Sequence, residues 1–132
     1  MRTIKFRAKS MSKNDTKWHY GLIKSIAEDG TGFMATEHRN CIHINVDTIG
    51  QFTGLLDKNG VDIYEGDIVK GRRYSGEIGV FNRHVGIVIY VLGTFVARGY
   101  GDSLGADTYL NCNFEVIGNM HDDKEWLDVR QI

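Results

Sequence analysis

The sequence predicts a mainly β protein, built as a small sandwich or an open barrel. Short stretches in which apolar and polar residues alternate recur along the 132 residues, and this period of two is typical of half-buried strands. The chain has 16 Gly and no Pro, so it is rich in turns. Before residue 122, no stretch of ten or more residues has apolar side chains at helical spacing.

The first 50 residues are expected to form four strands, at 3–8, 18–26, 32–36 and 41–47. The first two make a hairpin around the polar loop 10–17. Trp18, Tyr20 and Leu22 fall on one face of the second strand, so we predict that they fill the core. The other alternating positions predicted to face inward are Ile4, Phe6, Ala8, Ile42, Ile44 and Val46.

After a soft boundary near residue 50, turns become denser. Asn59-Gly60 and Gly66-Asp67 are strong turn signals because these residues tolerate a positive φ or bond to nearby amides. Between such turns we expect strands at 68–74, 77–81, 85–92, 94–98 and 114–117. A short helical turn is expected over 122–129. We predict two regions, 1–50 with the hairpin and 51–132 with the later strands and a C-terminal tail. The two regions are expected to pack together as one compact unit.

Composition is that of an ordinary globular domain, with 42% hydrophobic and 25% charged residues. No apolar run reaches the roughly 18 residues of a membrane-spanning helix, and residues 1–7 lack the pattern of a secretory leader. The two cysteines, Cys41 and Cys112, are therefore expected to be reduced thiols. We expect a cytoplasmic protein with no membrane partner.

Charge is distributed unevenly. The net charge of −1 gives no electrostatic argument for a nucleic-acid partner of the whole chain. However, residues 1–27 hold seven Lys or Arg and one acid, a net of +6, and residues 101–132 hold seven acids and two bases, a net of −5. The two ends either neutralise each other or form separate patches, and both alternatives stay open.

Catalytic and metal motifs are not found. Cys41 and His43 lie two residues apart, but Cys112 and His121 are nine apart, and structural zinc sites use two tight pairs. The glycines of 99–105 have the wrong spacing for a dinucleotide site, and the chain has neither a P-loop nor a hydrolase elbow. We expect no metal, no cofactor, no small-molecule substrate and no enzymatic activity. A hydrolase or metal enzyme, the alternative, requires a buried carboxylate pair or a bound metal.

Two segments combine Lys, Arg and aromatic residues, a mixture typical of surfaces that bind single-stranded nucleic acid. One is the first hairpin, whose Trp18 is assigned to the core above. The other is the segment Lys70–Tyr74, which Arg83 and His84 follow. The candidate nucleic-acid contacts are Lys70, Arg72, Arg73, Tyr74, Lys5 and Arg7.

The stretch 85–92 is apolar on both faces. A strand of a small barrel normally has one face in solvent, so this one must be covered by the hairpin, by the tail or by another subunit. The alternative function is therefore a homo-oligomeric interaction or assembly module. Its candidate interface residues are Ile87, Ile89 and Val91.

The segment Gln51–Val69, QFTGLLDKNGVDIYEGDIV, resembles the signature of the YopX family, small proteins carried mainly by phages and prophages. Ile4–Ala8 is similar to the family's opening, and Glu115–Asn119 to its closing strand. Lys9 stands where the family often has an aromatic residue, and no Asn-Pro follows the closing strand.

The resemblance implies a mainly β fold with an SH3-like open barrel over 51–132 and the N-terminal strands packed alongside. The biochemical function of the family is uncharacterised, so the resemblance brings no catalytic residues. Together with the residues, it implies an accessory protein in the cytoplasm of a bacterial host. We expect a non-enzymatic binding module that contacts nucleic acid.

Overall fold

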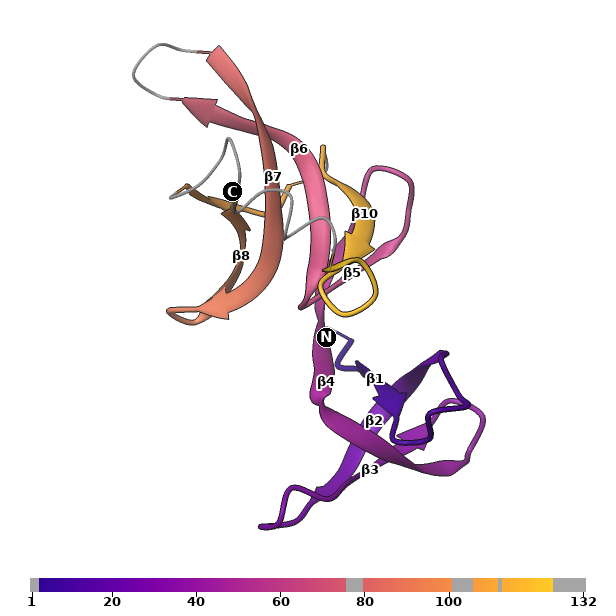
Figure 1. Ribbon diagram of the computed structural model, residues 1–132. Coiled ribbons are helices and arrows are strands. Elements are labelled where there is room, and N and C mark those ends of the chain that lie inside the picture. Colours follow the sequence, from indigo (N-terminus) through magenta and orange to yellow (C-terminus); the bar gives the residue numbers. More distant parts are fainter. Residues whose placement is uncertain (1–2, 76–79, 101–105, 112, 125–132) are drawn as a thin grey trace. The chain divides into compact units, whose positions relative to one another are not determined.

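The computed structural model describes residues 3–75, 80–100, 106–111 and 113–124 (Figure 1). These residues form ten strands in two five-stranded sheets, with the orders β1-β2-β3-β4-β5 and β10-β6-β7-β8-β9. The prediction of a mainly β fold is confirmed, whereas the SH3-like arrangement stays a prediction. The chain divides into two compact units, Met1–Phe52 and Thr53–Ile132.

The first unit is a closed ring of four strands. The strands are β1 (Phe6–Ser10), β2 (Trp18–Ile26), β3 (Gly32–Thr36) and β4 (Cys41–Leu56), whose last residues, 53–56, belong to the second unit. Each pairs with the next in antiparallel fashion, and β1 also pairs with β4, which closes the ring. The interior is a hydrophobic cluster of Ala8, Met34 and Ile44, with Phe6, Ile23, Ile42 and Ile49 packed against it.

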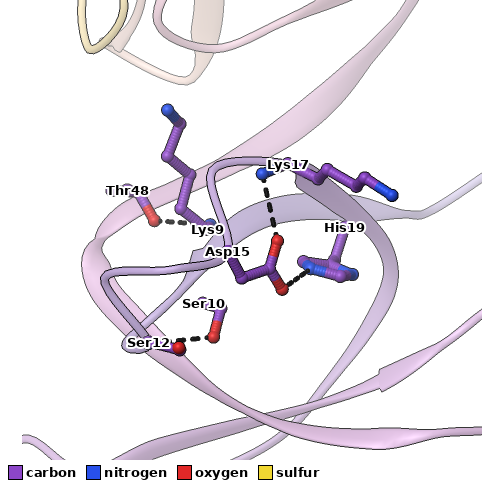
Figure 2. A network of polar contacts seen from close by, with 7 residues as sticks. All are labelled: Lys9, Ser10, Ser12, Asp15, Lys17, His19 and Thr48. Atoms are coloured by element: carbon purple, nitrogen blue, oxygen red, sulfur yellow. Dashed lines mark hydrogen bonds and ion pairs between the residues drawn. The ribbon is translucent and has the colours of Figure 1, made fainter.

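An irregularity in β4 permits this closure. Along β1, Arg7 pairs with Gly50 while Lys9 pairs with Asn45, so several residues of β4 bulge outward between the two pairs. The Thr48 hydroxyl accepts a hydrogen bond from the Lys9 amide at 2.8 Å and donates one to the Asn45 carbonyl at 2.6 Å. These two bonds replace ladder contacts that the bulge removes, and Figure 2 shows the one between Thr48 and Lys9.

The polar loop between β1 and β2 has its own hydrogen bonds (Figure 2). Asp15 accepts from the Lys17 amide at 3.1 Å, and its other oxygen lies 2.8 Å from His19 Nε2. The hydrogen bond to His19 is the main cause that lowers the pKa of the Asp15 carboxyl. The expected hairpin and its polar loop are present.

The predicted burial of Trp18, Tyr20 and Leu22 is wrong. Tyr20 and Leu22 are 37% and 55% exposed, and Trp18 is half-buried. The pairing of β1 with β2 decides this outcome. Ala8 of β1 faces the interior, and its register partner on β2 is His19, not Trp18. Directly opposite residues of an antiparallel pair share a face, so Trp18 and Tyr20 lie on the face opposite Ala8, together with Lys9 and the buried Arg7.

The second unit holds the remaining strands, which are β5 (Asp62–Tyr64), β6 (Asp67–Ser75), β7 (Val80–Val91), β8 (Thr94–Gly99), β9 (Asp107–Tyr109) and β10 (Glu115–Asn119). The strand predicted at 85–92 falls on the long strand β7, as do residues 80–81 of the strand predicted at 77–81, whose residues 77–79 lie outside the described chain. The strand β9 was not predicted. Asp67 is buried and accepts a 2.7 Å hydrogen bond from the Tyr64 amide, which fixes the tight turn before β6.

Both faces of the second sheet carry buried apolar residues. One cluster contains Ile63, Val69, Val88, Ala97 and Phe114, and the other contains Ile68, Val85 and Tyr100. Neighbours along one strand, such as Ile68 and Val69, belong to different clusters because side chains alternate between faces. The two-faced apolar pattern of β7 is thus covered in part by residues of its own unit.

The expected helical turn over 122–129 is not supported. A turn covers residues 120–122 after β10, where the Asp123 amide donates to the Asn119 carbonyl, and residues 125–129 lie outside the described chain. In the part of the chain that the structure describes, no helix is long and apolar enough to cross a membrane.

Candidate functional site

A groove of about 390 Å³ opens on the second unit and is lined mainly by cations. Its walls come from β6, β7, β10 and the loop segments beside them. The lining residues are Lys58, Lys70, Gly71, Arg72, Arg83, Asn113 and Glu115. Four cationic side chains and one carboxylate give this lining a formal net charge of +3.

Two arginines stand directly opposite each other in the groove. Lys70 and Arg72 are two residues apart on β6 and therefore share a face of the strand. Arg83 of β7 is the register partner of Arg72, so both exposed guanidinium groups lie on that same face. Like charges at directly opposite positions destabilise a sheet. The pair therefore places two positive charges side by side on neighbouring strands of the groove.

Glu115 is the groove's carboxylate. It is the register partner of Lys70 across β10 and β6. Its Oε2 lies 3.5 Å from Lys58 Nζ and 3.8 Å from Lys70 Nζ. Both lysine side chains are about half exposed, so these ion pairs contribute little to stability.

Lys58 reaches the groove because a buried carboxylate ties its loop to β10. Asp57 Oδ1 accepts hydrogen bonds from the amides of Asn59 and Val61, at 2.8 and 2.9 Å, and Oδ2 accepts from the Val116 amide at 3.0 Å. The Lys58 amide donates to the Phe114 carbonyl at 2.9 Å. Burial raises the pKa of Asp57, but the three amide donors together outweigh it and hold the pKa below its ordinary value.

Gly71 and Phe114 support the groove from beneath. Phe114 is fully buried, and its ring meets the ring of His84 edge-on at 6.0 Å. A Cβ at Gly71 would lie 2.6 Å from Phe114 Cδ1. Only glycine leaves room for the ring at this point of β6, and the ring positions the backbone that carries Glu115.

The structure brings together two of the residues expected to contact nucleic acid, Lys70 and Arg72. Arg73 and Tyr74 continue β6 and pair with Asn82 and Phe81, and only their backbone is described. The expectation named Arg83 as a neighbour of this segment. It missed Lys58, Asn113 and Glu115, which are distant from Lys70 in sequence. The Asp-Lys-Asn-Gly turn was the only sequence signal near Lys58.

Lys5 and Arg7 belong to the first unit. Lys5 Nζ lies 4.9 Å from the centre of the Phe52 ring, and the Arg7 guanidinium carbon lies 4.5 Å from that of Trp18. Lys9 Nζ lies 5.3 Å from the same Trp18 ring. These contacts are cation–π interactions, and Arg7 is buried. They do not involve the groove residues.

The candidate interface residues lie on β7, between β6 and β8. Ile87 packs against the buried cluster of Ile68, Val85 and Tyr100, and Ile89 and Val91 are half-buried. The homo-oligomeric alternative stays a prediction.

Within the described ranges, no three His, Cys, Asp or Glu side chains gather as metal ligands would. Cys41 and His43 are both exposed on β4, and the His43 ring stacks on Phe33 at 5.2 Å. Cys112 lies outside the described chain.

Comparison with known proteins supplies a family. None of the curated proteins that were compared matches the chain. The family model described as YopX protein matches residues 5–128. This match includes the ten described strands and the groove, and it extends over the three segments whose resemblance was noted above, apart from Ile4. The chain therefore belongs to the YopX family.

Proposed function

We propose that this chain is a non-enzymatic binding module that holds the phosphate backbone of nucleic acid in the cationic groove of its second unit. The observation that carries the proposal is the opposed pair Arg72 and Arg83, flanked by Lys70 and Lys58. We place the module among accessory proteins of phages and prophages that act in the host cytoplasm, the setting that the family resemblance implies.

The chemistry of the lining favours phosphate. Guanidinium groups present planar pairs of donors that match the oxygens of a phosphodiester, and lysine adds a point charge beside them. Phosphate contacts of this kind position a protein on nucleic acid without reading its sequence. The described lining contains no aromatic ring, which favours contact with the backbone over stacking on bases.

The same lining supports binding rather than catalysis. It holds one carboxylate and, among its described residues, no His, Cys, Ser or Thr. General acid–base catalysis and nucleophilic catalysis depend on such groups, usually as a hydrogen-bonded pair. The groove instead offers partly exposed cations from two neighbouring strands and a turn, which suits reversible ion pairing with a flexible polyanion.

The test is the double variant Arg72→Gln/Arg83→Gln. Affinity for short single- and double-stranded DNA and RNA is measured by fluorescence anisotropy at low salt, with a thermal melt to verify folding. We expect the double variant to lose about tenfold or more in affinity, because two phosphate contacts are removed. The matched control, Lys13→Gln/Arg39→Gln, removes the same charge from exposed positions of the first unit and retains binding.

Two results contradict the proposal. One is a folded native chain that binds none of these nucleic acids even at low salt. The other is a double variant that binds as tightly as its control, which would place the contact elsewhere on the chain.

A further inference from the structure

Glu115 occupies an unexpected place for an acid. A groove that binds phosphate gains nothing from a carboxylate among its cations, yet Glu115 lies within 4 Å of two of them. Both lysines approach the same oxygen, Oε2, at 3.5 and 3.8 Å. The carboxylate therefore stands where an anionic ligand oxygen would stand.

We infer that Glu115 is an internal counter-ion that limits the affinity of the groove for polyanions. In the free protein it partly neutralises Lys58 and Lys70. In the complex it repels any phosphate held by these lysines, so bound phosphate is directed toward Arg72 and Arg83. The inference rests on the proposed function and adds a regulator of binding strength to it.

The backbone, and not the lysines, holds Glu115 in position. On one side, Phe114 is buried and its carbonyl accepts the amide of Lys58. On the other side, the Val116 amide donates to Asp57. Because both neighbours are fixed, Glu115 projects from the same point of β10 whether or not its carboxylate is charged. A substitution at Glu115 thus changes the charge of the groove and leaves its framework in place.

The ion pairs themselves are weak enough to exchange. At 3.5 and 3.8 Å the contacts exceed the usual N–H···O distances of a strong hydrogen bond, and the side chains are partly exposed. An incoming phosphate therefore displaces the carboxylate from the lysines readily. After this exchange, the bound phosphate and the Glu115 carboxylate still repel each other. With the two charges about 4 Å apart in water, this repulsion lowers the affinity of the groove for phosphate by about fivefold.

The test is a charge series at this position, Glu115→Gln and Glu115→Lys, measured against the same short DNA and RNA at several salt concentrations. Glu28, an exposed acid in the turn after β2, supplies the matched controls Glu28→Gln and Glu28→Lys. We expect affinity to rise by about fivefold from native to Glu115→Gln, and again to Glu115→Lys. The dependence of log Kd on log salt becomes steeper by about one for each unit of positive charge that the substitution adds to the groove, which is one for Glu115→Gln and two for Glu115→Lys.

The outcomes separate the two proposals. If the Glu115 variants bind no better than the Glu28 controls while Arg72→Gln/Arg83→Gln still loses about tenfold or more in affinity, the inference is wrong and the proposed function stands. Weaker binding of DNA and RNA by Glu115→Gln than by the native chain would likewise overturn the inference. It would show that the carboxylate itself contributes a favourable contact to the ligand. If neither the native chain nor the Glu115 variants bind at low salt, both proposals fail.

Discussion

At the scale of single residues, Asp57 shows how one buried carboxylate connects distant parts of the sequence. It accepts two amides from its own turn and a third from Val116, 59 residues away. The turn that carries Lys58 is thereby fixed to the strand that carries Glu115. Loss of these bonds should loosen both the second unit and its groove.

We expect Asp57→Asn to destabilise the chain by about 1–3 kcal/mol at pH 7, because an amide NH₂ cannot accept the hydrogen bonds that the lost oxygen accepted. The measurement is urea unfolding of the native and variant chains. Since the pKa of Asp57 is lowered by folding, its contribution is complete above the ordinary pKa of aspartate, about 4, and is lost as the pH falls through the lower folded value.

The difference in stability between native and Asp57→Asn should therefore shrink as the solution is acidified into this range. A difference that is the same at neutral pH and well below the ordinary aspartate pKa would contradict the assignment. It would indicate that the charge of Asp57 contributes nothing to folding.

At the scale of strands, closure of the first ring depends on how closely β2 approaches β3. A Cβ at Gly21 would lie 2.1 Å from the carbonyl oxygen of Ala35. We expect Gly21→Ala to destabilise the chain by about 2 kcal/mol or more, because the strands must separate to admit the methyl group. Gly30→Ala is the control, since its Cβ would meet no atom within 4 Å and only its positive φ of 87° opposes the change. If urea unfolding shows that Gly21→Ala and Gly30→Ala lose equal free energy of unfolding, crowding against Ala35 is not the cause of the destabilisation.

The strands themselves could be predicted from the sequence, because alternation and turn residues act locally. The ranges 18–26 and 32–36 coincide with β2 and β3. The buried face of β2 could not be predicted, because apolar residues occur on both of its faces and pairing with β1 decides between them. For the same reason Lys70 and Arg72 could be named as a basic segment, whereas Glu115 joins them only through the register of β10 with β6. Lys58 joins them only through the hydrogen bonds between its turn and residues 114–116.

At the scale of the whole molecule, the net charge of −1 includes a groove lining of +3, which leaves −4 on the rest of the chain. Attraction to a polyanion is therefore local and easily screened. A lining of net +3 corresponds to a slope of log affinity against log salt of about −2 for single strands and about −3 for duplexes. Between about 50 mM and about 200 mM salt, affinity should fall by about 20-fold for single strands and about 40-fold for duplexes.

A titration over this salt range checks the number of charges that bind. A slope much steeper than about −3 would require more cations than the groove supplies, and would extend the contact to the basic residues of the first unit. A slope near zero would remove the phosphate contacts on which the proposed function depends. The predicted slope holds only if the acidic remainder of the chain stays clear of the bound strand, so a strand long enough to pass beyond the groove should bind no more tightly than a short one.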